Sequence, residues 1–174
     1  MSSQVAENPM RRIKIEKVTL NICVGADENR LLKAKKLLEK LTGQTAVILR
    51  AKKTIREFHI RRNQPIAVKV TLRGKKAEEF LNRALDAVKR TLKASQFDEH
   101  GNFSFGIKEY IDIPGVQYDY EIGMFGMDVC VTLCRPGWRI KYRRRCRSSI
   151  GKKHLITREE AIEWVKNALR VEIV

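Results

Sequence analysis

Alternating apolar and polar positions predict five β-strands along this chain. In the first, residues 12–24, Ile13 and Ile15 share one parity whereas Val18 begins a run on the other, which indicates a bulge or bend near Lys17. The other four strands are expected at residues 45–51, 66–73, 103–113 and 127–134, and the terminal VEIV is a candidate edge strand. One apolar and one polar face per strand is the pattern of a sheet covered on one side only.

Helical periodicity predicts two helices with apolar stripes between these strands. Residues 28–42 repeat apolar side chains at helical spacing, with Asp27 or Asn29 as the candidate N-cap. Residues 75–92 carry a broader stripe. Both stripes need an apolar surface to cover, and the apolar face of the sheet is the available partner.

A third helix is expected near the end of the chain, where Thr157 and Glu160 have the spacing of a capping box. The order of elements is then β-α-β-loop-β-α-β-β-basic segment-α. This order predicts an α+β fold: a mostly antiparallel sheet with helices packed on one face, an open polar face and a long basic hairpin loop.

The length of 174 residues suits a single domain spanning residues 1–174. We expect a flexible N-terminus at 1–9, a basic extension at 135–156 and a C-terminal helical region at 157–174. No apolar run approaches the roughly 20 residues that a membrane helix needs, and the first residues lack the apolar stretch of a secretory signal. The chain is therefore expected in the cytoplasm.

Charge narrows the choice of partner. Thirty-six Lys and Arg face 20 Asp and Glu, which gives a formal net charge of +16. Such an excess opposes compaction unless an anionic partner neutralises it. Phosphate-rich polymers are the usual partner, and an acidic membrane surface is the weaker alternative.

The positive charge gathers in three places that RNA could contact. The polar parity of the strands carries Asn21, Lys69, Thr71 and Arg73, although a solvated sheet face would look the same. Residues 52–63 form a long basic loop with apolar and aromatic side chains at its tip. The run 135–147 is basic, with Trp138 and Tyr142 interleaved, and offers the side chains Arg139, Lys141, Arg143, Arg144 and Arg145.

The sequence gives little support for a catalytic or metal-binding site. The three histidines have no nucleophile motif beside them, and GNFSFG leads into a strand, so it lacks the context of a phosphate-binding loop. Cys130 and Cys134 lie four apart on a strand, about 13 Å from each other, too far to share one tetrahedral ion. We expect reduced thiols, no cofactor, no metal and no enzymatic activity.

Five sequence blocks resemble a known family. KIEKVTLNICVG, LTGQTAVI, RAKKTIREFHIRRNQPIAVKVTLRG, GNFSFGIKEYIDIPGVQYD and IGMFGMDVCVTLCRPGWR are similar, in this order, to the universal large-subunit ribosomal protein numbered five in bacteria and eleven in eukaryotes. The likeness runs from about Asn8 to the end of the chain. RPGWR and KKHLITREEAIEW resemble the archaeal and eukaryotic branch of that family.

The resemblance implies a structural protein that binds 5S rRNA in the central protuberance of the large ribosomal subunit. It implies 5S rRNA contacts at Asn21, Gln44 and Thr71, beside Lys69 and Arg73 on the same face. It also implies a loop facing the peptidyl-site tRNA, whose residues are Lys53, Thr54, Ile55, Arg56, Phe58, His59, Arg61 and Arg62. The sequence differs from the frequent family pattern at Lys108-Glu109-Tyr110 and at Glu57-Phe58-His59.

The implied partners are 5S rRNA, large-subunit rRNA, peptidyl-site tRNA and two proteins. One is the second 5S-binding ribosomal protein, universal number eighteen; the other is universal number thirteen of the small-subunit head, across an intersubunit bridge. A membrane is not among them. The alternative function is a non-ribosomal RNA-binding or RNA-modifying accessory protein.

Overall fold

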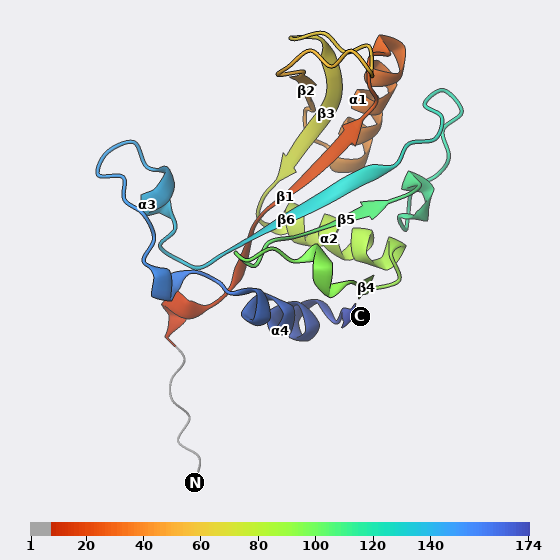
Figure 1. The fold of residues 1–174 in the computed structure, drawn as a ribbon. Helices are drawn as coiled ribbons and strands as arrows, with labels where there is room; N and C mark the ends of the chain where they lie inside the picture. Colours follow the sequence, from red (N-terminus) through yellow and green to blue (C-terminus); the bar gives the residue numbers. More distant parts are fainter. Residues whose placement is uncertain (1–7) are drawn as a thin grey trace.

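A five-stranded antiparallel sheet organises the protein, in the order β2-β3-β1-β6-β5 (Figure 1). The computed structural model describes residues 8–174, so the flexible N-terminus predicted at 1–9 falls almost wholly outside it. The strands are β1 (Lys14–Cys23), β2 (Val47–Arg50), β3 (Pro65–Leu72), β5 (Phe103–Ile107) and β6 (Met127–Cys134). This confirms the predicted α+β class with a mostly antiparallel sheet.

Strand β1 lies in the middle of the sheet, between β3 and β6. The register shifts between Ile15 and Lys17, which confirms the bulge that the change of parity predicted. Beyond the bulge, Val18, Leu20 and Ile22 all point into the core and are buried. The bulge therefore lets one strand keep its apolar side chains on the covered face along its second half.

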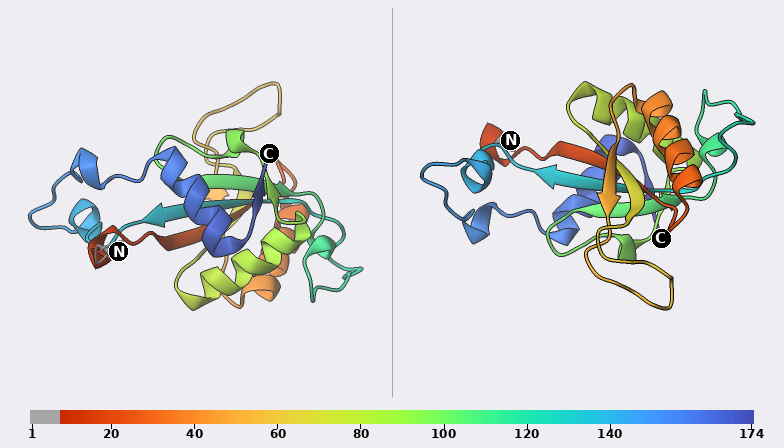
Figure 2. Two further views of the ribbon diagram at one scale, coloured as in Figure 1. Left: turned by 90° about the horizontal axis from the view of Figure 1, so that it is seen from below. Right: turned by 90° about the horizontal axis from the view of Figure 1, so that it is seen from above.

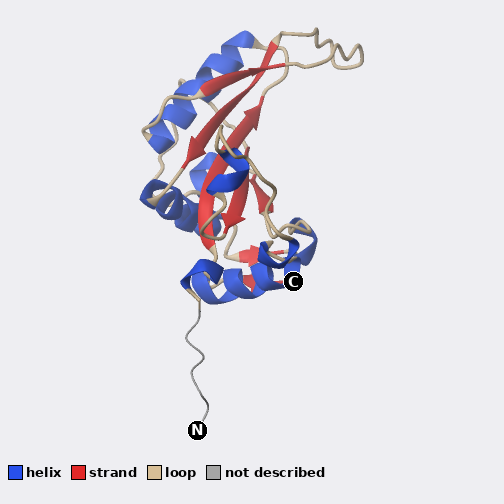
Figure 3. Cartoon of the chain, turned by 90° about the vertical axis from the view of Figure 1, so that its left-hand side faces the viewer, coloured by secondary structure: helices blue, strands red, loops and turns tan. Residues whose placement is uncertain are grey.

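Two helices cover this apolar face. They are α1 (Glu28–Thr42) and α2 (Lys75–Ala87), and Figure 3 shows both along one side of the sheet. Asp27 caps α1, because its Oδ1 accepts the backbone N–H groups of Asn29 and Arg30 at 3.0 and 3.2 Å. Gly43 ends this helix in the left-handed conformation.

The second helix ends earlier than its periodicity predicts. Lys89 and Arg90 have positive φ, so the chain leaves the helix after Ala87 and enters β4 (Thr91–Leu92). Arg90 holds this exit, since its guanidinium donates to the Asp86 carboxylate at 2.6 Å and to the Leu169 carbonyl at 2.9 Å. The predicted terminal strand is confirmed as β7 (Glu172–Ile173), which pairs in parallel with β4 outside the main sheet.

The strand predicted at 103–113 is wrong beyond Ile107. The chain turns at Tyr110–Asp112 into a 3₁₀ helix (η3), although the apolar alternation continues. Tyr110 explains the departure: its ring is fully buried, and its hydroxyl accepts the backbone N–H of Asp119 at 3.0 Å. Because this ring is buried in the core, the chain leaves the sheet after Ile107.

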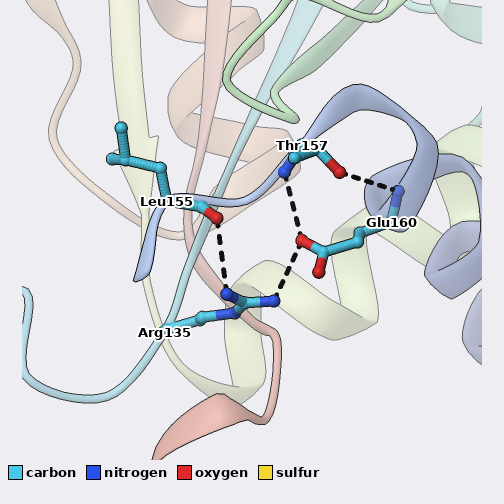
Figure 4. A network of polar contacts seen from close by, with 4 residues as sticks. All are labelled: Arg135, Leu155, Thr157 and Glu160. Atoms are coloured by element: carbon cyan, nitrogen blue, oxygen red, sulfur yellow. Dashed lines mark hydrogen bonds and ion pairs between the residues drawn. The ribbon is translucent and has the colours of Figure 1, made fainter. Parts of the chain in front are cut away.

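The C-terminal region docks through an ion pair whose arginine is buried and whose carboxylate is partly exposed (Figure 4). Arg135 is only 6% exposed, and its guanidinium donates to Glu160 Oε2 at 2.9 Å and to the Leu155 carbonyl at 3.3 Å. The same carboxylate accepts the Thr157 N–H, while Thr157 Oγ1 accepts the Glu160 N–H, which confirms the capping box of α4 (Arg158–Leu169). Arg135, the first cation of the basic run, is therefore structural.

Candidate nucleic-acid interface

The polar side of β3, β1 and β6 forms one continuous surface, called the open face below. Its members are Lys17, Thr19, Asn21, Lys69, Thr71, Asp128, Cys130 and Thr132, all half-buried or exposed. The register places Asn21 between Lys69 and Asp128, and Thr19 between Thr71 and Cys130. Side chains of directly opposed residues lie about 5 Å apart at Cβ, so these groups can bind one ligand together.

Asn21, Lys69 and Thr71, which the alternation assigned to the polar side, are thus brought together. Gln44 lies in the connection from α1 to β2, where its backbone N–H donates to Thr42 Oγ1 at 3.3 Å. This puts Gln44 just ahead of Val47, which pairs with Lys69. Gln44 is therefore at the β2 border of the open face.

Arg73 is less free than the sequence suggested. It follows β3 and lies 3.5 Å from the carboxylate of Glu16, and it also donates to the Glu16 carbonyl at 3.4 Å. Glu16 sits in the β1 bulge with its side chain largely buried. Part of the charge of Arg73 is therefore used within the protein.

The basic loop connects β2 to β3 and has a defined hairpin geometry. Ile55 and Ile60 exchange two backbone hydrogen bonds of 2.8 and 3.0 Å, and Arg62 N–H donates to Thr54 Oγ1 at 3.1 Å. His59 takes the left-handed conformation that closes the tip. Both views of Figure 2 show the loop projecting on the side of the sheet opposite α1 and α2.

The loop presents its cations and one aromatic ring to solvent. Phe58 at the tip is 68% exposed. Among residues 8–174, every ion pair lies outside this loop, so the charges of Lys53, Arg56, Arg61 and Arg62 are uncompensated by acidic side chains at contact distance. Such a tip can contact a phosphate backbone and stack against a base or a ribose.

The second basic projection follows β6 and contains the short helix α3 (Arg139–Tyr142). Its cations at Arg139, Lys141, Arg143, Arg144 and Arg145 are all exposed. The place of Trp138 among these cations suggested an exposed aromatic side chain. In the structure Trp138 is only 9% exposed and packs into the core. Lys141 Nζ lies 5.6 Å from the centre of the Trp138 ring and 5.8 Å from that of Tyr142.

The two projections lie at opposite ends of the open face. Cys23, at the end of β1, pairs with Ala67 near the start of β3, where the basic loop joins the sheet. Lys14, at the other end of β1, pairs with Cys134, from which the second projection continues. Figure 1 shows the loop and α3 extending from different ends of the long strands.

Two side chains of the open face, Asp128 and Cys130, were not among the site residues predicted from the sequence. Asp128 is a carboxylate at the β6 border of the open face, next to Asn21. Burial, and next the charge of Asp128, raises the pKa of the neighbouring Cys130 thiol. Both residues stand on the polar parity of the predicted 127–134 strand, so the alternation contained the signal.

No group of three or more His, Cys, Asp and Glu side chains within residues 8–174 has the arrangement of a metal site. All four cysteines are free thiols. Over the same residues, no helix combines the length and apolar character needed to cross a bilayer.

Two family models cover most of the chain. Residues 8–61 match the model of ribosomal protein L5, and residues 65–164 match the model of the C-terminus of the ribosomal L5 family. The chain belongs to the ribosomal protein L5 family. Its curated relatives include "Large ribosomal subunit protein uL5" of Sulfurisphaera tokodaii, 55% identical over 100% of this chain and 99% of the relative. The proteins of the same name from Pyrobaculum aerophilum and Methanococcus maripaludis are 52% and 50% identical, each over 97% of this chain and 94% of the relative.

Membership of the L5 family settles the class of protein. The chain is a structural, non-enzymatic ribosomal protein, and the relatives named above are archaeal, which agrees with the branch that its sequence blocks resemble. The L5 family also places it in the large subunit of the cytoplasmic ribosome. The resemblance seen in the sequence is therefore confirmed.

Proposed function

We propose that the chain binds 5S rRNA in the central protuberance through its open face. The observation that carries this proposal is that helices cover one side of the sheet, while the other keeps Asn21, Lys69 and Thr71 in adjacent positions. Amide, hydroxyl and ammonium groups match the 2′-hydroxyls and phosphates of RNA. The net charge of +16 supplies the attraction.

The projections have separate roles in this proposal. The basic loop contacts peptidyl-site tRNA, since it extends away from the sheet and carries free cations and an exposed Phe58. The exposed cations from Arg139 to Arg145 contact large-subunit rRNA at the opposite end. The second 5S-binding protein, universal number eighteen, and the small-subunit head protein, universal number thirteen, are the proposed protein partners.

Sucrose-gradient sedimentation tests the assignment. A tagged copy of the chain, expressed in an archaeal host, should migrate with large subunits and leave them together with 5S rRNA when high salt strips the particle. A chain that stays at the top of the gradient would contradict the proposal. A chain that pellets with anionic vesicles and does not bind RNA would also contradict it.

Replacing Arg56, Arg61 and Arg62 together by alanine should separate the two RNA contacts. Affinity for 5S rRNA should change less than about threefold, because the loop lies outside the open face. Binding of tRNA should weaken several-fold, and the slope of log affinity against log salt should fall by up to about 3 if each arginine contacts one phosphate. Filter binding at several salt concentrations gives both numbers.

The control for the loop variant replaces three exposed cations on the helix side, Lys33, Lys36 and Lys76, by alanine. It removes the same charge from the chain and should leave the tRNA salt slope unchanged. Loss of 5S rRNA binding in the loop variant alone would show that the loop belongs to the 5S site.

Alkylation of native thiols should map the RNA footprint. Because burial and Asp128 raise the pKa of Cys130, less thiolate is present near neutral pH, and its alkylation should accelerate as the pH rises above the usual thiol range. Addition of 5S rRNA should slow Cys130 alkylation at least fivefold, roughly the effect of 1 kcal/mol of protection. Cys146, beyond α3, should keep its rate, and mass spectrometry of the labelled peptides compares the two. Equal protection of both thiols would contradict the proposal that 5S rRNA binds the open face and not the second basic projection.

A further inference from the structure

A carboxylate stands at the β6 border of a surface that is otherwise suited to a polyanion. Asp128 is exposed on β6, and the register places it between Asn21 on β1 and Gly106 on β5. Within residues 8–174, its side chain takes part in no ion pair and no hydrogen bond of the folded chain. Its nearest cation on this row, Lys69, is two strands away, or about 10 Å.

The space around Asp128 is open on one side. A Cβ atom added to Gly106 would lie 3.8 Å from Asp128 Oδ1, so the carboxylate leans towards the strand position that has no side chain. The other open-face neighbours, Asn21 and Cys130, are small. The row Lys69–Asn21–Asp128–Gly106 therefore runs from a cation through an amide and a carboxylate to a gap.

This order restricts what RNA can place there. Like charges at contact distance repel, and more strongly near a protein surface than in bulk water, so a phosphate is disfavoured beside Asp128. A carboxylate accepts hydrogen bonds only. The RNA groups that fit are uncharged donors: ribose 2′-hydroxyls and the amino or imino groups of base edges.

We propose that Asp128 is a specificity-determining residue, which accepts a hydrogen bond from an uncharged RNA donor lodged over Gly106 and keeps the phosphate backbone away from the β6 border of the open face. This inference rests on the proposed binding of 5S rRNA. Lys69 then holds backbone at the β3 side, and Asp128 selects the register in which a donor group, not a phosphate, meets β6.

The test compares a 5S rRNA transcript with an unrelated structured RNA of equal length. Asp128→Ala should bind the unrelated RNA up to about threefold more tightly, because a repulsive charge is gone, and 5S rRNA about tenfold more weakly, because a hydrogen bond is lost. Asp128→Asn keeps an acceptor oxygen and should fall between Asp128→Ala and the unmodified chain. An equal gain for both RNAs would overturn the proposal, since the carboxylate would then only repel.

A second variant does not depend on the charge. Gly106→Val fills the gap with a residue that strands favour, so the fold should be kept while 5S rRNA binding weakens and binding of the unrelated RNA does not. Thr91→Val, at an exposed position of β4 outside the main sheet, is the control and should leave 5S rRNA binding unchanged. If Gly106→Val leaves 5S rRNA affinity unchanged, no RNA group occupies the gap and the inference fails.

Modified transcripts identify the donor. If single 2′-deoxy substitutions remove the effect of Asp128→Ala, the donor is a ribose; if inosine for guanosine does so, it is a base amino group. If the effect needs Mg²⁺ at constant ionic strength, a hydrated cation is held there, and the hydrogen-bond proposal is overturned. If the unmodified chain prefers neither RNA, the proposed binding of 5S rRNA itself fails. This outcome differs from a failure of the Asp128 proposal, in which the unmodified chain still prefers 5S rRNA.

Discussion

Replacing Asn21 and Thr71 together by alanine should weaken 5S rRNA binding by about 10- to 100-fold. Each substitution removes one polar group from the open face, and a hydrogen bond is worth about 0.5–1.5 kcal/mol, or more when its RNA partner is left unpaired. Both side chains are only half-buried, and neither supports the fold through a side-chain hydrogen bond among residues 8–174. Electrophoretic mobility shifts at fixed salt measure the change.

The matched control for this variant is Asn82→Ala with Asn167→Ala, which removes two exposed amides from the helices. It should bind 5S rRNA like the unmodified chain. Circular dichroism should give the same melting curve for both double variants. An affinity for 5S rRNA that does not change in the Asn21 and Thr71 variant would remove these residues from the site.

Replacing Glu160 by glutamine should lower the free energy of unfolding by about 1–2 kcal/mol. Glutamine can still complete the capping box, so the substitution isolates the loss of charge beside Arg135. Breaking a fully buried ion pair costs about 3–5 kcal/mol, and the value is smaller here because the Glu160 side chain is 46% exposed. Urea denaturation with tryptophan fluorescence gives the difference.

The cost of this substitution should depend on pH. Burial raises the pKa of Glu160, but hydrogen bonds from Thr157 and Arg135 outweigh it, so the pKa lies below its usual 4.5. The carboxylate therefore stabilises the fold above pH 4.5, and this contribution is lost as the pH falls through the lowered pKa. The two proteins should converge in acid. Glu159→Gln, in the same helical turn, is the control, and an equal loss there would mean that the ion pair does not matter.

The alternation of side chains predicted the sheet because its strands face the core on one side and solvent on the other. The bulge near Lys17 was visible for the same reason, since an extra residue shifts parity. The helix predicted to Leu92 and the strand predicted to Ile113 were too long. Their ends depend on tertiary contacts, those of Arg90 with the Leu169 carbonyl and of Tyr110 with the Asp119 amide, which no local pattern contains.

The candidate site could be predicted in part for similar reasons. Asn21 and Thr71 lie on strands, where parity alone fixes the face that a residue occupies. Gln44 lies in a connection without periodicity, so only the family resemblance pointed to it. Trp138 is buried although cations surround it in the sequence, because its ring packs into the hydrophobic core. The ion pair of Arg73 with Glu16 joins residues far apart in the sequence and left no local signal.

The central position of β1 has a consequence for synthesis of the chain on a translating ribosome. One of its neighbours, β3, follows within about fifty residues, but the other, β6, is made more than a hundred residues after β1. Until β6 leaves the exit tunnel, β1 is an unpaired edge that can pair with other chains. The surface for RNA is then also half-built, because Asp128, Cys130 and Thr132 are missing. Capture of RNA by the complete surface is therefore restricted to chains that are nearly finished.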